Sequence, residues 1–509
     1  MGESLAMSGK GKTKINDWLI LAIIITALTP VTIDATILHV AIPTLTLSIG
    51  ASGNEVLWII DTYPLIMAGL LLPMGVLGDK VGHKKILIFG VAIFALASLF
   101  AGLSTAPIYL ILSRALLALG GSMIMPVTLA IIRQTFTDEE KCGRALGVWA
   151  AVGTMGAAIG PLIGGILVEH YSWEAVFLVN IPLLLIVIPL IYFGIPKGIS
   201  DPKKAWILKD AVLLLIGVIT FVYALKSVFK EGQPIWISLI AGITGFILLR
   251  WFFKKQQHSA LPMLDISLLQ DRRILIGMLL CFVPMAVIVG FEFLLAQELQ
   301  FVHQMTPINA GLFMLPLACS AAVAGPVTGP FIKRIGFRKV LIAVLAISSI
   351  SFFSLSFHDF SSMSVSLCCW LISLGFSLGM ILMAATTSIM SATPIDKAGA
   401  AGSMESIAYE LGTGLGIAFF GIILSQVFMG KFIIPEELLS DVPKQAQSSI
   451  SDALILANSL GGSKADEIRK AAMIAFEGAH NGVLILAGSF LAILAVMMVF
   501  LLPKDEKTF

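Results

Sequence analysis

Long runs of apolar residues alternate with short polar segments along nearly all of the 509 residues. Many runs contain about 18 residues or more, the length that an α-helix needs to cross the hydrocarbon core of a bilayer. The pattern therefore predicts an all-α membrane protein with fourteen transmembrane helices. The approximate cores of the predicted spans are 18–40, 56–75, 85–104, 107–132, 146–168, 174–195, 207–229, 235–253, 274–299, 309–331, 338–357, 363–390, 404–428 and 481–502.

One loop sequence occurs twice between apolar runs. Residues 75–87 read GVLGDKVGHKKIL and residues 329–341 read GPFIKRIGFRKVL, with two glycines and a basic cluster at the same spacing. Each copy follows the second helix of its half, so the repeat predicts two pseudo-symmetric six-helix bundles with an inserted helix pair between them (6+2+6). Parallel repeats of this kind are typical of transporters whose substrate site lies near the midplane between the halves.

The domain organisation follows from this repeat. The first apolar run is too long for a cleaved signal peptide and is interpreted as an uncleaved first span. The predicted segments are a cytoplasmic N-terminus 1–17, a bundle 18–195, a linker 196–272 with helices seven and eight, a bundle 273–502 and a cytoplasmic C-terminus 503–509.

The second bundle includes one long hydrophilic loop, 430–480, predicted to lie on the periplasmic side. Two helical patterns in it are separated by Gly461 and Gly462, which predicts a helical hairpin. Two roles remain open for this hairpin: a lid that packs on the outer face, or an element that gates transport or binds a partner.

Composition supports a membrane protein and gives it an orientation. Hydrophobic residues make up 58% of the chain and charged residues 13%, whereas a soluble chain carries about 25% charged residues. The net charge of +2 gives no indication of nucleic-acid binding. Basic residues gather in alternate loops, so the positive-inside rule predicts that both termini are cytoplasmic. The basic residues of the predicted cytoplasmic loops are Lys80, Lys84, Lys85, Arg144, Lys203, Lys204, Lys254, Lys255, Arg272, Arg273, Lys333, Arg334, Arg338 and Lys339.

Five of the acidic residues inside the predicted spans are the main functional candidates, because an ionisable side chain there is costly. Asp34 and Asp61 are expected at similar depth in the outer half, and Glu292 is the second-half counterpart of the Asp34 region. Glu405 and Glu410 point about 140° apart on one helix and cannot form a dyad on one face; Glu410 is favoured as the cavity-facing acid. Each carboxylate can hold either a proton or a cation, as proton/cation exchange requires. A structural hydrogen-bonding role is the alternative for each.

Other polar residues within the spans have less certain roles. Arg114 keeps its proton, so it is predicted to anchor an intramembrane acid or to tune that acid's protonation, with Asp34 as the first candidate partner. His39 is expected to pack near Asp34. Lys226 is expected to extend to the outer surface, and Glu298 to lie at the outer rim.

Glycine, proline and aromatic residues suggest how the spans pack. Gly160 and Gly164 permit close contact between helices, and Pro161 removes a backbone hydrogen bond and bends the helix. Trp58 and Phe291 each lie within one turn of an acid. Their rings are candidates for binding a cation in the cavity.

The first copy of the repeated loop is predicted to control the conformational change. Asp79 lies beside Lys80 and His83 at the inner end of the second span, where it can form a latch with neighbouring helix ends. Gly75 and Gly82 belong to the same predicted switch. The second copy carries only positive charge and is expected to contact anionic lipid.

No motif indicates an enzyme or a cofactor. The five cysteines have no metal-ligand spacing, and we find no phosphate-binding loop and no serine nucleophile motif. No metal site is expected, and ATP-driven export is excluded for the same reason. A non-transporting enzyme or sensor remains a remote alternative.

Several segments resemble the fourteen-helix drug/proton antiporters of the major facilitator superfamily. They are DATILHVAIP at 34–43, RALLALGG at 114–121, GAAIGPLIGG at 156–165 and WEAVFLVNIP at 173–182, together with the loop at 75–87. Leu117 and Ala118 replace the usual Gln and Gly, and Glu174 stands where Arg is common. The runs LWIID at 57–61 and ESIAYELG at 405–412 look most like the SmvA/QacA type of multidrug efflux pump.

This resemblance implies a function. Exporters of this type use the proton motive force, without a cofactor, to expel quaternary ammonium compounds, dyes and bisbiguanides. The expected partners are small hydrophobic cations, protons and membrane lipids, with no nucleic acid, and a monomer is expected. An exporter of an endogenous metabolite, such as an amino acid or a small peptide, is the alternative.

Overall fold

The computed structural model describes residues 16–196, 200, 208–228, 234–259, 266–393, 398–434 and 447–502. These residues are helical apart from short turns, and no strand occurs among them. Within the described ranges, 14 helices are long and apolar enough to cross a membrane. The predicted all-α class and the predicted number of spans are therefore confirmed.

The first bundle contains six spans, and the sixth is interrupted at Val179. Its helices are α1 (Asp17–Ile49), α2 (Gly53–Val81), α3 (His83–Gly102), α4 (Pro107–Thr135), α5 (Glu139–His170), and α6 (Ala175–Leu178) with α7 (Asn180–Gly194). Local signals set several of the boundaries. Ser52 and Glu55 form a capping box at the start of α2, and Asp138 caps α5 by accepting a hydrogen bond from the amide of Lys141.

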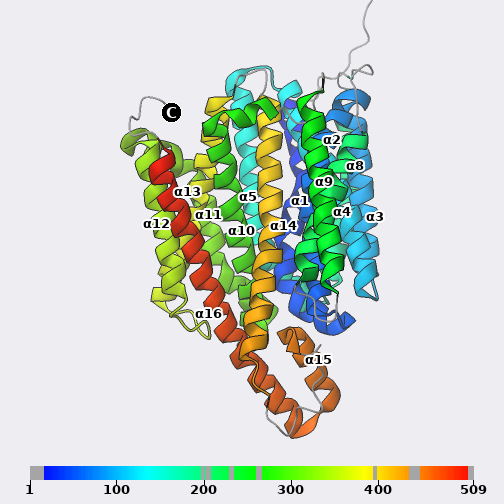
Figure 1. Cartoon of the computed structure of the whole chain (residues 1–509). Helices are drawn as coiled ribbons and strands as arrows, with labels where there is room; N and C mark the ends of the chain where they lie inside the picture. The colour runs from blue at the N-terminus through cyan, green and yellow to red at the C-terminus, as the bar shows by residue number, and fades with distance from the viewer. Residues whose placement is uncertain are drawn as a thin grey trace, which may run out of the picture.

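Two inserted helices, α8 (Leu208–Val228) and α9 (Ile235–Gln257), follow the first bundle. They pack on each other, and α8 also packs on α2 and touches α14 (Figure 1). Gly69 of α2 allows this contact, because a Cβ there would lie 2.9 Å from Leu215 of α8. The inserted pair therefore lies against the second helix of the first bundle.

The second bundle repeats the first. Its elements are η1 (Ile266–Gln270), α10 (Arg272–Gln297) with the π-helical turn η2 (Glu298–Val302), α11 (Pro307–Ile335), α12 (Phe337–Leu355), α13 (Val365–Ala392), α14 (Ala398–Lys431), α15 (Ile450–Leu460) and α16 (Gly462–Leu501). The repeated loops share an unusual backbone: Gly82 has a φ of 108° and Gly336 a φ of 96°, a region that favours glycine.

The long hydrophilic loop differs from its predicted form at one boundary. The turn at Gly461 and Gly462 is present, with φ values of 67° and 66°. The second arm of the hairpin, however, is continuous with the last span, so α16 runs from Gly462 to Leu501 instead of beginning near 481. Small buried alanines keep the helical spacing through this region, which gives the helix no reason to end. Residues 435–446 lie outside the described residues, as do the terminal segments 1–15 and 503–509.

The two ends of the molecule have different characters. We call the end with the loops 75–87 and 329–341 the basic end, and the end with α15 the hairpin end. In Figure 1, α15 projects beyond the helices at the bottom, whereas α16 finishes at the top. Among the described residues, those that line the contact between the bundles come from α1, α2 and α5 on one side and α10, α11 and α14 on the other.

Close contacts between the bundles lie toward the hairpin end. A Cβ on Gly311 would lie 2.7 Å from the carbonyl oxygen of Pro161, and one on Gly421 would meet the side chain of Leu57. Toward the basic end, a Cβ on Gly147 of α5 or on Gly329 of α11 would meet nothing within 4 Å. The structure is therefore packed shut between the bundles at the hairpin end.

Candidate functional site

Asp34 of α1 pairs with Arg114 of α4 inside the first bundle. Nη1 of Arg114 lies 2.5 Å from Oδ2 of Asp34, and the two side chains are 2% and 0% exposed. Arg114 also donates from Nε to the carbonyl oxygen of Ile59 at 3.2 Å, and its guanidinium lies 4.5 Å from the ring centroid of Tyr63. The partner suggested by the sequence is thus the partner in the structure. The pair joins α1, α2 and α4.

Asp61 has a partner that the sequence analysis did not foresee. Lys226 was expected to extend to the outer surface, but this prediction is wrong. Its Nζ lies 2.6 Å from Oδ2 of Asp61, with side chains 3% and 0% exposed. The ammonium also lies 4.1 Å from the ring centroid of Trp58. Because α8 packs on α2, the lysine has a carboxylate within reach and does not need to extend to water.

Trp58 therefore binds a cation, although that cation belongs to the protein. Its ring also lies 6.4 Å from the ring of Tyr223 on α8. Trp58 and Asp61 are three residues apart and share the face of α2 that meets the inserted helix. This position differs from the central cavity proposed for Trp58 from the sequence.

Two glutamates of the second bundle lie at the boundary between the bundles. Oε2 of Glu292 on α10 lies 3.8 Å from Nδ1 of His39 on α1, and the Glu292 side chain is 16% exposed. His39 thus faces Glu292 rather than packing on Asp34. Glu410 on α14 lies within electrostatic range of Tyr63 on α2. In the described part of the chain, no lysine or arginine pairs with either glutamate.

Two tyrosines connect these charges into one cluster. Tyr63 lies close enough to interact electrostatically with Asp34, Arg114 and Glu410. Tyr409 interacts in the same way with Glu410 and Glu292. We refer to Asp34, His39, Tyr63, Arg114, Glu292, Tyr409 and Glu410 as the interface cluster.

The sequence analysis missed both tyrosines, although a signal was present. Each is a polar aromatic residue within one turn of an intramembrane acid. Two residues of helix turn Tyr63 about 200° away from Asp61. Tyr63 can therefore face the interface cluster while Asp61 faces α8.

Glu405 belongs to a different environment from Glu410. Its carboxylate accepts a hydrogen bond from the hydroxyl of Thr386 on α13, inside the second bundle. The expected angle between the two glutamates therefore places their side chains next to different neighbours. Glu410 faces the first bundle, whereas Glu405 is held by a neighbour in its own bundle.

Phe291 is not a cavity residue, and that prediction is wrong. Its ring is buried and packs edge-on against Phe352 at 5.3 Å and beside His480 at 6.0 Å. Both neighbours belong to the second bundle. One residue of helix is about 100°, so the face that presents Glu292 to α1 turns Phe291 into the bundle.

Glu298 was expected at the outer rim; it lies in the turn η2 at the hairpin end of α10, but its side chain is buried. Only 2% of its side chain is exposed, and it contacts His480 of α16 and lies 3.6 Å from Nε2 of His303. The sequence analysis placed residue 480 in the loop. His480 was therefore missed as an intramembrane group, and Glu298 was left without a partner.

Helix α5 packs tightly on α1 of its own bundle and on α11 of the other bundle. A Cβ on Gly160 would collide with Thr36, and one on Gly164 would lie 2.6 Å from the carbonyl oxygen of Ile37, so this face packs on α1. Thr36 donates its hydroxyl hydrogen to the carbonyl oxygen of Ala157 at 2.9 Å. Pro161, by contrast, faces Gly311 of the other bundle.

Helix α14 has the same arrangement in the second bundle. A Cβ on Gly412 would lie 2.5 Å from the carbonyl oxygen of Phe282 of α10, whereas one on Gly414 would lie 2.9 Å from Leu65 of α2. Each of these helices therefore packs on the first helix of its own bundle with one face and on the opposite bundle with another.

The first repeated loop contains a short chain of polar contacts. Oδ1 of Asp79 lies 3.0 Å from Nε2 of His83, and Nδ1 of the same ring lies 3.2 Å from the side-chain amide of Gln134 at the end of α4. Gly75 packs near Pro126, also on α4. These contacts connect the basic ends of α2, α3 and α4.

We expect Asp79→Asn to slow transport about tenfold while changing substrate affinity less than about twofold, because the contact holds helix ends far from the interface cluster. Initial rates and equilibrium binding of a fluorescent cation, measured on purified protein, check this expectation. Glu140→Gln is the matched control, since Glu140 is an exposed acid of the same end paired only to Arg144 in the described residues. A large loss of binding in Asp79→Asn would show that the loop is not a switch.

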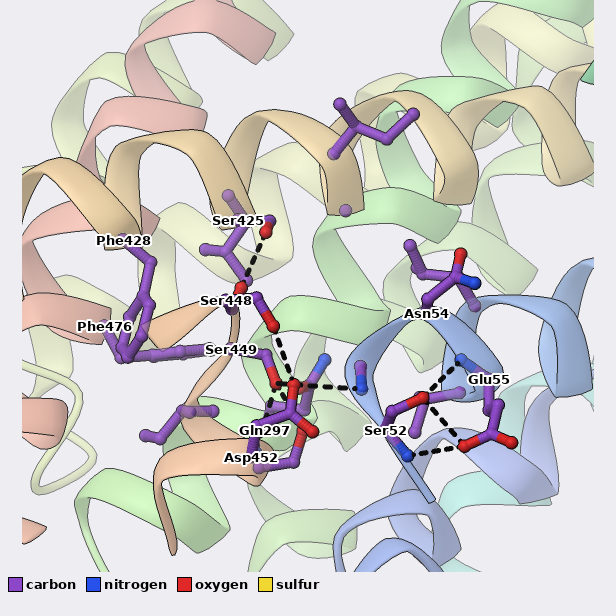
Figure 2. Close-up of a pocket in the computed structure, with 18 of the residues that line it drawn as sticks. Ser52, Asn54, Glu55, Gln297, Ser425, Phe428, Ser448, Ser449, Asp452 and Phe476 are labelled. Atoms are coloured by element: carbon purple, nitrogen blue, oxygen red, sulfur yellow. Dashed lines mark hydrogen bonds between the residues drawn. The ribbon is translucent and has the colours of Figure 1, made fainter. Parts of the chain in front are cut away.

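The hairpin connects the two bundles at the opposite end. Oδ2 of Asp452 accepts hydrogen bonds from the hydroxyl of Ser449 at 2.6 Å and from the amide of Gly53 in α2 at 3.4 Å. The hydroxyl of Ser425 in α14 donates to the carbonyl oxygen of Ser448 at 2.6 Å. Figure 2 shows Ser448, Ser449 and Asp452 between Ser52, which caps α2, and Ser425 of α14.

A cavity of about 410 Å³ lies beneath this connection. It is lined by side chains from both bundles and the hairpin, and Lys226 of α8 also reaches it. Phe428, Phe476 and Gln297 face it in Figure 2. The hairpin end thus combines a closed contact between the bundles with an internal space.

Comparisons with known proteins agree with this architecture. The model of the major facilitator superfamily matches residues 24–417. The chain belongs to this superfamily, and it is a membrane transporter rather than an enzyme. It is 46% identical, over 96% of this chain and 99% of the relative, to the methyl viologen resistance protein SmvA of Salmonella typhimurium.

Two further similarities extend the comparison. The multidrug efflux pump LfrA of Mycolicibacterium smegmatis is 31% identical, over 92% of each chain. A bacterial homologue of the human lysosomal transporter Spinster, in an inward-facing and occupied conformation, superposes with a TM-score of 0.68 at 18% identity, covering 96% of this chain and 97% of that one. At this identity the last similarity shows the fold alone. The relatives place the chain among multidrug efflux and resistance transporters of the superfamily.

Proposed function

We propose that this protein is a proton-coupled antiporter that exports lipophilic, mainly cationic compounds by alternating access. Quaternary ammonium compounds, dyes and bisbiguanides form the proposed substrate class. The name of the relative SmvA refers to methyl viologen, an organic dication, which supports this class. The proton motive force drives the exchange without a cofactor.

The observation that carries the proposal is the pair of glutamates without a basic partner at the boundary between the bundles. Glu292 and Glu410 face α1 and α2 of the opposite bundle. A carboxylate removed from water strongly favours neutralisation, which either a proton or an organic cation can supply. Tyr63 and Tyr409 lie beside these acids. The Tyr63 ring already contacts Arg114, whereas the partly exposed ring of Tyr409 offers an aromatic face that attracts a cation.

Competition between these two ligands provides the coupling. A cation that enters displaces the proton, and a proton that arrives from the other side displaces the cation. The acids lie at the boundary between the bundles. Each conformational change between the inward-facing and outward-facing states therefore exposes the same groups to the opposite side of the membrane. Asp34 differs because Arg114 already neutralises it, so we assign this pair to holding the first bundle together.

Sidedness follows from the basic loops. We place the basic end in the cytoplasm and the hairpin end in the periplasm of a bacterial inner membrane, with both termini cytoplasmic. The closed contact at the hairpin end then corresponds to an inward-facing state, in which the substrate enters from the cytoplasm or the inner leaflet.

Transport into proteoliposomes tests the proposal. Purified protein, reconstituted with an imposed pH gradient, is expected to move ethidium or methyl viologen against its concentration gradient. Collapse of the gradient with a protonophore should abolish this accumulation. Transport at full rate after collapse would exclude proton coupling. A saturable substrate that is neither cationic nor lipophilic, with no export of the two probes, would favour an endogenous metabolite instead.

A further inference from the structure

The ion pair between Asp61 and Lys226 is buried but poorly supported. Apart from the 2.6 Å contact between them, neither charged group has a hydrogen-bond partner in the described part of the chain. Removing two charges from water is unfavourable, and the attraction between them offsets this cost only when further hydrogen bonds complete the site. The pair of Asp61 and Lys226 lacks these further hydrogen bonds among the described residues.

The other buried pair of the first bundle provides a contrast. Arg114 contacts Asp34, the carbonyl oxygen of Ile59 and the ring of Tyr63 at the same time. These attachments connect α4 to both α1 and α2. Lys226 is a single flexible side chain on an inserted helix that lies outside both bundles.

The environment of the Lys226 ammonium has the chemistry of an organic-cation site. Asp61 supplies a carboxylate and Trp58 supplies an aromatic face 4.1 Å from the nitrogen. A desolvated cation is attracted electrostatically to such a face. Lys226 also lines the 410 Å³ cavity at the hairpin end, whose lining combines the rings of Phe428 and Phe476 with polar side chains such as that of Asp452.

We propose that Trp58 and Asp61 form a second organic-cation site that is reached from the hairpin-end cavity where Lys226 lines it, and that Lys226 is a tethered cation that competes with the substrate for it. The proposal rests on the proposed cation export. A substrate that enters this cavity meets Lys226 and takes its place at Asp61, and the return of Lys226 to Asp61 displaces the substrate and prevents rebinding. The inserted helices α8 and α9 then have a specific task, which is to carry this lysine.

Binding of tetraphenylphosphonium to the full-length purified protein, measured by titration calorimetry at pH 8, tests the proposal. Lys226→Met is expected to strengthen binding about tenfold, because the competing cation is absent. The gain should disappear in the double variant Asp61→Asn/Lys226→Met, which has no carboxylate to release. Lys226→Gln keeps a donor for Asp61 and should give a smaller gain in the same direction if the methionine variant fails to fold.

Lys431→Met is the matched control. It removes a lysine from the same end of the molecule, where Nζ of Lys431 donates to the carbonyl oxygen of Gly478 and contacts no acid among the described residues. Its affinity should equal that of the wild type. Unchanged affinity in folded Lys226→Met or Lys226→Gln, with a wild type that binds the probe, would overturn the competing role of Lys226 alone. A wild type that does not bind the probe would overturn both the proposed function and this inference.

Discussion

Glu410→Gln is expected to lower proton-driven export of organic cations by about a hundredfold and to leave the protein folded. Losing a charged partner of a desolvated cation costs about 2–5 kcal/mol, and each 1.4 kcal/mol is about tenfold in affinity. Glutamine has the shape of protonated glutamate but can neither release a proton nor neutralise a cation. The variant therefore mimics one state of the cycle permanently.

Stability should be unaffected because no basic partner is left behind. Among the described residues, no cation pairs with Glu410, so the substitution removes a costly buried acid without leaving another charge uncompensated. Ethidium flux in proteoliposomes and thermal unfolding of the purified variant measure the two effects.

Glu405→Gln on the same helix is the natural comparison. Glu405 is held by Thr386 within the second bundle, so its replacement should lower export less than tenfold. Equal losses in the two variants, or an unstable Glu410→Gln protein, would contradict the assignment of Glu410 to the exchange step.

Arg114→Met is expected to destabilise the protein by about 3–5 kcal/mol, because it leaves the carboxylate of Asp34 buried without its partner. Both side chains are almost completely buried, so water cannot replace the guanidinium. The variant also loses the hydrogen bond to Ile59 and the contact with the Tyr63 ring, which join α4 to α2.

The double variant Asp34→Asn/Arg114→Met separates the charge from the shape. If the penalty arises from the unpaired carboxylate, neutralising Asp34 should recover most of the lost stability, since replacing both partners of a buried pair is often close to neutral. Unfolding in detergent, followed by tryptophan fluorescence, gives the three free energies. An Arg114→Met protein as stable as the wild type would show that the pair is not an anchor.

Properties that depend on a single helix or a single loop were predicted well from the sequence. The length of the apolar runs predicts the fourteen spans. The repeated glycine-basic loop predicts the duplication, and Gly82 and Gly336 have similar φ values in the two copies. The angle between Glu405 and Glu410 follows from helical geometry alone. These properties are local, so the chain specifies them before any helix meets a neighbour.

Contacts between helices were predicted poorly. Lys226 was expected at the surface but pairs with Asp61, Phe291 was expected in the cavity but packs inside its bundle, and Glu298 meets His480. The pairing of Asp34 with Arg114 was the exception, since an arginine within a span requires a nearby acid and few were available.

The sequence alone determined how many helices cross the membrane, that two halves are related, and how far along each helix its charged residues lie. The tertiary structure decided which acids are neutralised by a basic side chain and which face the boundary between the bundles. The physical reason is the solvent. A lipid-facing surface is as apolar as a packed one, so the pattern of apolar residues does not show which face of a membrane helix meets which neighbour.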